Sequence, residues 1–380
     1  MKAPFDILIY RKGKSVMGKF DVDKYCREYY TLPHGEIRMA YLREAWREAD
    51  ELEDYTWRMK LRMEFIHESD FYSDAMEMYV IMPELLKIYD EYVEQYGVNE
   101  STCHEVMWKY KWILETSRDF YQISIKQFEN ISEDMKRRFL EAGYSLRPYY
   151  AYLFEFYIYI DGEKAEHFYQ EFKKCKRDRM CDCAACERND EVEYLLECGN
   201  IDQAKKKAKV LFDGRMTCAE VPEATYGKFL RYYNLQLCQG EQDCLKEAEK
   251  CCKEVDNAVR RRGIVQKYFG DVMLFYALTN QEKALDWFKH FWSLYESNKN
   301  PIYKLYFAFG MIRFVKQLQE EKDSYRMKLP NSFPLYQEDG NYDLEELREY
   351  YESFARSCAQ KFDARNGTRH FMDLYEIIQT

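Results

Sequence analysis

The sequence predicts an all-α protein in which pairs of helices stack one after another. Glycine and proline are scarce, at 15 and 8 of 380 residues, and such a composition favours long helices joined by tight turns. From Gly35 onward apolar residues recur at helical spacing, as Tyr41, Ala45 and Ala49 do. Turn signals that recur along the chain complete the prediction.

Each of four short turns comes before a helix that carries a small residue near its start. The spacing of roughly forty residues lies in the range of helical-hairpin repeats, and small residues allow neighbouring helices to approach closely. We therefore expect a solenoid whose repeats are degenerate and tetratricopeptide-like, since a regular repeat of that type has about 34 residues. The turns are Asp161-Gly162, Gly199-Asn200, Gln239-Gly240 and Thr279-Asn280, and the small residues are Ala165, Ala204, Ala248 and Ala284.

The chain divides into four expected segments. Residues 1–34 form an N-terminal segment in which the β-rich stretches 5–10 and 16–20, around a turn at 12–15, predict a small hairpin. Helical pairs are expected over 35–178, tetratricopeptide-like repeats with a cysteine cluster over 179–320, and an acidic linker with capping helices over 321–380. The pattern leaves open whether the repeats form one solenoid or two lobes that meet near residues 177–181.

Composition and charge exclude several function classes. The chain is 47% hydrophobic and 33% charged, as expected of a folded, water-soluble protein. Its formal net charge of −10 argues against bulk binding to nucleic acid, which requires a cationic face. The sequence has neither the run of roughly eighteen apolar residues that a membrane helix needs nor a recognisable signal peptide. We expect a cytoplasmic protein without a membrane partner, in which the 13 cysteines stay reduced.

Three cysteines have the spacing of metal ligands. Cys183 and Cys186 are separated by two residues, so a turn can place both thiolates at corners of a zinc tetrahedron. Cys218 follows Cys186 by about one repeat, and stacking of two repeats brings their helix starts together. The sequence therefore predicts a structural zinc site to which these three residues contribute.

Cys252 is the predicted fourth ligand, because it shares an apolar helix face with Leu245 and Val255. Its neighbour Cys251 is expected to point toward solvent. Cys181, Cys175 or Cys251 remain possible substitutes. A zinc ion with four protein ligands has no open position, so the metal would hold two repeats together without catalysing a reaction. The alternative interpretations are that the cysteines are small core residues or, less favoured, a redox pair.

The segment from Cys183 to about Ala284 resembles bacterial tetratricopeptide-like proteins of uncharacterised function. The shared pattern is C-x2-C before a helix, a G-x-x-x-x-A turn and then C-A-E-x-P, matched here by 183–186, 199–204 and 218–222. Such proteins carry a histidine at the position of Cys252, which agrees with a metal site because cysteine and histidine both bind zinc. The resemblance implies an intracellular helical-repeat scaffold and brings no activity with it.

No catalytic motif is found in the sequence. Gly13-Lys14-Ser15 lacks the first glycine of a phosphate-binding loop, and none of the six histidines has a second one four residues away. The chain is therefore not expected to be an enzyme.

Aromatic and basic residues between 110 and 152 allow two interpretations. They are either core or the lining of a concave surface that holds a peptide or partner protein. The predicted function is a scaffold that binds a peptide or protein, and the alternative is an immunity or adaptor protein of a bacterial conflict or secretion system. The candidate partner-binding residues are Tyr110, Trp112, Tyr121, Arg137, Arg138, Arg147, Tyr149 and Tyr152.

Overall fold

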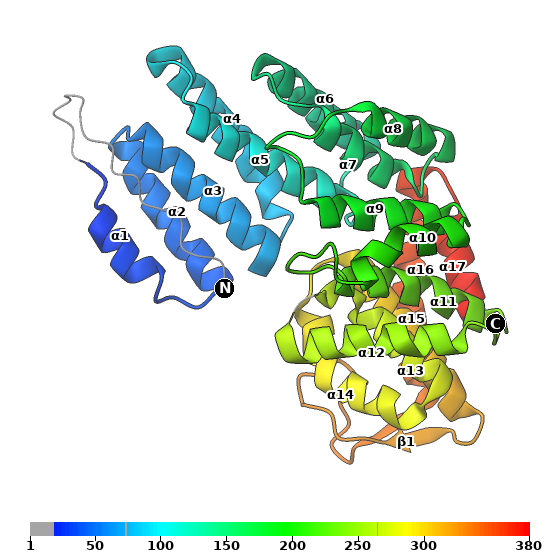
Figure 1. The fold of residues 1–380 in the computed structure, drawn as a ribbon. Coiled ribbons are helices and arrows are strands. Elements are labelled where there is room, and N and C mark those ends of the chain that lie inside the picture. Colours follow the sequence, from blue (N-terminus) through cyan, green and yellow to red (C-terminus); the bar gives the residue numbers. More distant parts are fainter. Residues whose placement is uncertain (1–18, 73, 264) are drawn as a thin grey trace. The chain divides into compact units, whose positions relative to one another are not determined.

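The computed structural model describes residues 19–72, 74–263 and 265–380 (Figure 1). These residues form seventeen α-helices, one short 3-10 helix and a two-stranded sheet, so the prediction of an all-α fold is confirmed. Among the described residues no helix combines the length and the apolar character needed to span a membrane. The predicted N-terminal hairpin falls almost entirely outside the described residues.

The chain forms two compact units, residues 1–102 and 103–380. Residue 178, where one predicted segment ends, lies inside the second unit. The described part of the first unit consists of α1 (Val22–Tyr29), α2 (Glu36–Glu51), α3 (Tyr55–Tyr72) and α4 (Glu77–Tyr96). In it α2 packs on α3 and α3 on α4. Leu42, Phe65 and Leu85 are fully buried in its core.

The second unit contains the repeated helix pairs. Residues 100–174 form α5 (Glu100–Ser117, which begins just before the unit), α6 (Ile125–Glu141), α7 (Arg147–Tyr157) and α8 (Gly162–Lys174). Then follow α9 (Ala184–Glu197), α10 (Ile201–Phe212), α11 (Glu223–Cys238), α12 (Leu245–Arg262), η1 (Gln266–Tyr268), α13 (Phe269–Thr279), α14 (Gln281–Ser297) and α15 (Pro301–Gln319).

In this unit the first helix of each pair packs against the first helix of the next. The contacts run from α7 to α9, α11, α13 and α15, and we call these five helices the central row. The second helices α8, α10, α12 and α14 each pack on their own partner. This arrangement is the nearest-neighbour stacking of a helical solenoid.

The predicted turns begin the second helix of each pair. Asp161 caps α8 by accepting a hydrogen bond from the backbone N–H of Lys164, and Asn280 caps α14 in the same way through Lys283. The small residue near the start of each second helix is at most 1% exposed, which is the close packing that the sequence predicts. These residues are Ala165, Ala204, Ala248 and Ala284.

The crossing of α13 with α15 depends on two glycines. A Cβ atom on Gly270 would lie 2.4 Å from the backbone nitrogen of Phe307, and one on Gly310 would lie 2.7 Å from that of Leu274. Backbone atoms cannot move aside as side chains do. Glycine at both positions therefore allows the two backbones to touch.

We expect Gly270→Ala to destabilise the protein by about 1–3 kcal/mol, because the added methyl group must push two helices apart. The matched control is Gly162→Ala at the start of α8, where a Cβ would meet nothing within 4 Å. That change should be neutral or slightly stabilising. Thermal unfolding of both variants tests whether the crossing of α13 and α15 requires glycine. Equal unfolding midpoints for the two variants would contradict this requirement.

The last part of the chain closes the end of the stack. Strands β1 (Ser324–Arg326) and β2 (Asn341–Asp343) pair antiparallel, with Tyr325 opposite Tyr342. Helix α16 (Leu344–Asn366) packs on α15, and α17 (His370–Gln379) packs on α16, α15 and α11. Helices α16 and α17 thus cover α15.

Candidate functional site

Three cysteine sulfurs meet where the first helices of two successive repeats begin. The sulfur of Cys186 lies 3.3 Å from that of Cys183 and 3.5 Å from that of Cys218. All three sulfurs lie within 4.8 Å of one another. The prediction that stacking brings Cys218 to the C-x2-C pair is confirmed in this geometry.

Local structure holds each thiol in place. Cys183 is the N-cap of α9, and its sulfur accepts a hydrogen bond from the backbone N–H of Cys186 at 3.3 Å. Cys218 lies in the loop between α10 and α11, where its own N–H donates to the carbonyl oxygen of Val221 at 3.0 Å. Cys183 is exposed and the other two are half-buried. An ion can therefore reach the cluster from solvent.

Cys218 is the thiol of this cluster that ionises most readily. A hydrogen bond from the Cys186 thiol, with others from the backbone N–H groups of Glu220 and Val221, lowers the pKa of Cys218 to about 5. The hydrogen bond with Cys218 and burial raise the pKa of Cys186 above its usual value. The cluster thus holds one thiolate readily, and a second negative charge needs a cation to stabilise it.

The three sulfurs could hold a metal ion. A tetrahedral zinc ion with Zn–S bonds of about 2.3 Å separates its sulfur ligands by about 3.8 Å. The observed separations of 3.3 and 3.5 Å need to widen by only a few tenths of an ångström. The donor set of thiolates alone suits a soft or borderline metal and not calcium or magnesium.

The structure does not bring Cys252 to this cluster, so the prediction of a fourth ligand is corrected. Cys252 is buried, at 1% exposure, and its thiol interacts with Tyr276 and Asp256. Its helix face is indeed apolar, but there Cys252 lies beside Tyr276 of α13 and not beside the other cysteines. Cys251, expected at the surface, is also buried, at 6% exposure.

The possible substitutes lie elsewhere as well. The thiol of Cys181 donates to the carboxylate of Asp178 at 3.7 Å, and Cys175 lies beside Arg147 at the end of α8. Among the described residues only three cysteines therefore share the cluster, which leaves one corner of a tetrahedral metal site open.

Arg147 and Tyr152, predicted to contact a partner, instead hold the segment that leads to Cys183. Arg147 binds the Glu187 carboxylate at 3.0 Å, and the Tyr152 hydroxyl donates to Asp182 at 2.9 Å. The buried Lys111 also contacts Asp182, at 2.7 Å. These contacts fix the start of α9, so the prediction of a binding surface at Arg147 and Tyr152 is corrected.

The other predicted partner-binding residues do not share one surface either. The rings of Tyr110 and Tyr149 are buried, and their hydroxyls donate to Asp134 and Glu133. Arg137 and Arg138 form ion pairs with Asp134 on their own helix. The ammonium group of Lys109 lies over the ring of Trp112, and the ring of Tyr121 packs edge-on against that of Phe362. The aromatic residues of this region are largely core, which is the first of the two interpretations that the sequence allowed.

A network of charged side chains, which we did not predict, lies along the central row. At its centre the Glu193 carboxylate on α9 binds Arg118 at 3.2 Å and Lys228 of α11 at 2.6 Å. Lys228 also binds Asp190 at 3.1 Å. Burial alone would raise the pKa of Glu193, but the charges of Arg118 and Lys228 outweigh it and hold that pKa well below its usual value.

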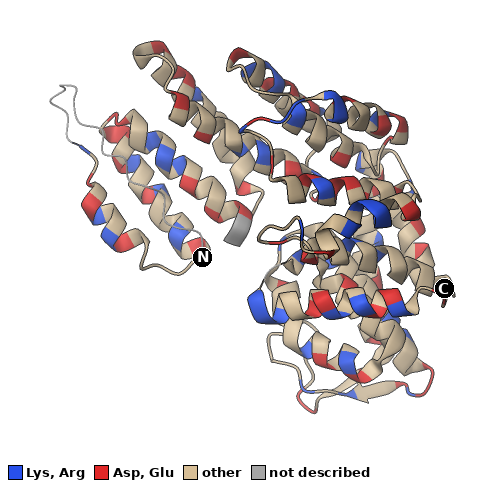
Figure 2. Cartoon of the chain, viewed as in Figure 1, with Lys and Arg blue, Asp and Glu red and all other residues tan. Residues whose placement is uncertain are grey.

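The network continues along the row toward α13 and α15. Arg231 on α11 makes two hydrogen bonds to the buried Asp271 carboxylate, at 3.0 and 2.9 Å, and its guanidinium lies 3.6 Å from the ring centre of Tyr306. Asn234 donates to the backbone carbonyl of Asp271 at 2.8 Å. Acidic and basic residues are likewise mixed along the helices of this unit, as on α12 (Figure 2).

Glu197, at the end of α9, is the accessible member of the network. Its side chain reaches solvent but lies in a region dense in protein atoms. Desolvation, together with the charge of Glu193, raises the pKa of Glu197 to about 7. The hydroxyl of Tyr159 donates to the Glu197 carboxylate at 3.3 Å.

We expect Glu197→Gln to alter how stability depends on pH. A folded-state pKa above the unfolded value of about 4.3 adds stability below pH 4, and this stability is lost as pH rises through 7. The variant should therefore gain stability relative to the wild type between pH 5 and pH 8. Urea unfolding at the two pH values measures this. Glu163→Gln, at an exposed position on α8, is the control, and the same pH trend in both variants would contradict the assignment.

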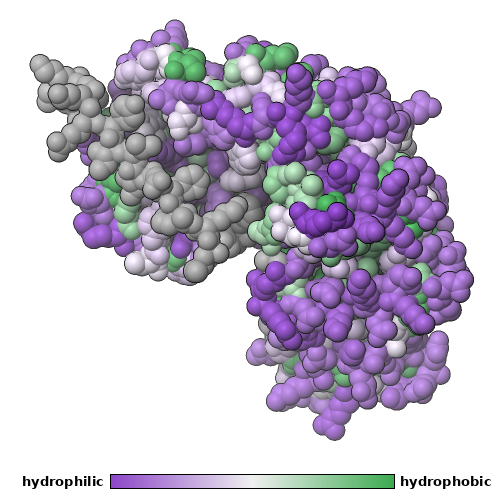
Figure 3. Space-filling view, in the orientation of Figure 1, coloured by the Kyte–Doolittle hydropathy of each residue, from purple (hydrophilic) through white to green (hydrophobic). Residues whose placement is uncertain are grey.

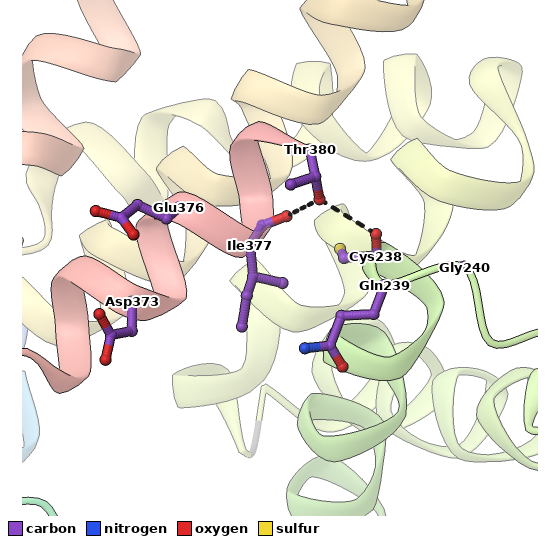
Figure 4. A pocket seen from close by; sticks show the side chains of 7 residues that line it. All are labelled: Cys238, Gln239, Gly240, Asp373, Glu376, Ile377 and Thr380. Carbon is purple, nitrogen blue, oxygen red and sulfur yellow. Dashed lines mark hydrogen bonds between the residues drawn. The ribbon is translucent and has the colours of Figure 1, made fainter.

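A surface hollow lies where the ends of α11 and α17 meet (Figure 4). The hydroxyl of Thr380 donates to the carbonyl oxygen of Cys238 at 3.4 Å across it. The acidic groups beside it, Asp373 and Glu376, are both paired with Arg369. The hollow is open and its charges are already paired, so it lacks the converging polar groups of a ligand site.

Comparison with known proteins adds no relative. No family model matches the chain, and no curated protein matches it.

Proposed function

We propose that this protein is a non-enzymatic helical-repeat scaffold that binds a peptide or protein partner on the central row of its second unit, with a structural zinc ion joining α9 to α11. The observation that carries the proposal is the charged network on that row. Stacked helix pairs commonly bind partners along one row of helices.

The network favours binding over a purely structural role. Burying ion pairs costs desolvation energy, and well-packed apolar residues stabilise a core at least as well. The central row nevertheless holds Arg118, Lys228 and Arg231 against carboxylates. At the edge of the network Glu197 is exposed. A partner with polar and charged groups can exchange hydrogen bonds with such a row.

The character of the surface supports a peptide or protein as the partner. The visible face of the second unit is mostly hydrophilic, with small hydrophobic patches (Figure 3). A membrane-binding face would need a larger apolar area. Nucleic acid is disfavoured because the cations of the network are already paired with carboxylates, which would repel phosphates.

Zinc at the cysteine cluster would have a structural role. Cys183 and Cys186 belong to the start of α9, and Cys218 precedes α11, so one ion would tie two repeats together at one end. The polar contacts Thr225–Asn189 and Lys228–Asp190 already join the same two helices further along. Three protein ligands leave the fourth position of the zinc to water, so the structural role rests on the joining of two helices and not on a closed ligand set.

Selection from a random peptide library displayed on phage tests the binding role. Peptides selected on the full chain should lose affinity when Glu197 is changed to Lys, because the charge on the central row is reversed. Glu163→Lys, on the second helix α8, should leave affinity unchanged. Peptides that respond equally to both changes, or a selection that yields none, would contradict the proposal.

A further inference from the structure

Seven acidic side chains are buried to at least nine-tenths among the described residues, and six of them have a hydrogen-bonded or ion-paired partner. For example, Glu187 binds Arg147, Glu191 accepts from Tyr169, and Asp363 accepts from two backbone N–H groups. Glu68, Glu193 and Asp271 are paired as well. Glu155 on α7, at 9% exposure, is the seventh.

Among the described residues Glu155 has no hydrogen bond or ion pair to its carboxyl group. A buried carboxyl without a partner is costly, and in native proteins such a group calls for an explanation. The slight exposure of Glu155 distinguishes it from a sealed core residue. Solvent therefore touches a small part of its side chain.

Charges of both signs act on Glu155, but none of them pairs with it. Two acidic groups act on it, Glu115 on α5 and Asp190 on α9. The nearest cations are Arg118 and Lys228, and both of these form ion pairs with Glu193. Tyr152, on α7 itself, is a further titratable group that interacts with Glu155. No described cation therefore pairs with Glu155 itself.

We propose that Glu155 binds the cationic group of the partner, an arginine guanidinium or a lysine ammonium, on the central row. This inference rests on the proposed function and specifies the chemistry of the partner. A guanidinium fits best, because its planar array of N–H donors can bind Glu155 and Asp190 together.

A bare metal ion is a poorer occupant of this place. A metal needs several ligand atoms close together, and among the described residues the cysteine cluster alone brings three candidate ligands within reach of one ion. The carboxyl groups around Glu155 are too far apart for that. An extended organic cation, which can span several ångströms, meets them more readily.

Binding of the cation should release a proton. Burial and the neighbouring Asp190 and Glu115 raise the pKa of Glu155 well above its usual value, so the free protein favours the neutral acid. A cation favours the carboxylate instead. Affinity for the cation should therefore rise with pH as long as Glu155 is protonated in the free protein.

The direct test uses a small probe and the full chain. Acetyl-arginine methylamide is titrated into protein labelled with ¹³C at glutamate side-chain carboxyls, and acetyl-citrulline methylamide, which has the same shape without the charge, serves as its control. The Glu155 signal, assigned by its absence in Glu155→Gln, should shift with the arginine probe alone. The shift should occur at lower probe concentration at pH 8 than at pH 6.

Two further outcomes decide the inference. In Glu155→Gln, the affinity of an arginine-containing peptide selected from the library should fall by about tenfold to a hundredfold, as for loss of a charge-assisted hydrogen bond. The variant should fold normally, since glutamine has the shape of the neutral acid. The inference would be overturned if the chemical shift of the Glu155 carboxyl carbon did not change with the arginine probe, or changed equally with the citrulline probe. If selection yields no peptide but the probe shifts Glu155, the proposed function fails and the cation site stands.

Discussion

Replacing Lys228 by methionine is expected to destabilise the protein by about 3–5 kcal/mol at pH 7. Lys228 is 6% exposed and binds both Glu193 and Asp190. Methionine keeps much of the apolar stem but removes the charge. The buried Glu193 carboxylate and the half-buried Asp190 carboxylate then lose the cation that binds both of them. The free energy of unfolding from urea titration measures the effect.

The control for this prediction is Lys206→Met at an exposed position on α10. It should change stability by no more than about 0.5 kcal/mol. The pKa of Glu193 is lowered in the folded protein, so its contribution to stability is present above pH 4 and lost as pH falls further. The difference between wild type and Lys228→Met should shrink in acid. Equal destabilisation by both lysine changes would show that the network contributes little.

The second large effect is expected from Cys186→Ser, which removes the central thiol of the cluster. Its sulfur is the one close to both others, so the variant should lose the metal and the stability that the metal provides. With free zinc a thousandfold above its dissociation constant, this loss is about 4 kcal/mol. Thermal unfolding of the wild type in EDTA should then match that of the variant.

Cys198→Ser is the matched control, because Cys198 is an exposed cysteine at the end of the same helix and lies outside the cluster. It should keep both metal and stability. Metal affinity should fall with pH, since thiolates must be deprotonated to bind. The role of the cluster would be contradicted if EDTA left the thermal unfolding of the wild type unchanged. It would also be contradicted if Cys198→Ser lost as much stability as Cys186→Ser.

The repeat pattern and the three clustered thiols could be predicted because each depends on local spacing. Ala204 and Ala248 follow their turns closely, and Cys186 and Cys218 lie one repeat apart at equivalent places. Stacking of successive repeats then brings residues at equivalent positions close together. The prediction of Cys252 as the fourth metal ligand was wrong for a related reason. A helical pattern identifies which residues are buried, but Cys252 lies about two turns into α12 and so about 11 Å from its start.

The charged network could not be predicted from one sequence. Arg118 and Glu193 are 75 residues apart, and Lys228 and Asp190 are 38 apart. Nothing local distinguishes these charges from those on a solvated helix face. The sequence could not decide whether Tyr149 and Tyr152 belong to the core or to a binding surface for a different reason. A tyrosine can bury its ring and still direct its hydroxyl to a surface carboxylate.

X-ray absorption at the zinc edge, on protein purified under reducing conditions, tests the central structural claim most directly. We expect one zinc ion per chain, bound by three sulfur atoms at about 2.3 Å and by one oxygen or nitrogen atom. Four sulfur ligands would show that a further cysteine joins the cluster. Protein without metal would contradict the account that a zinc ion joins α9 to α11.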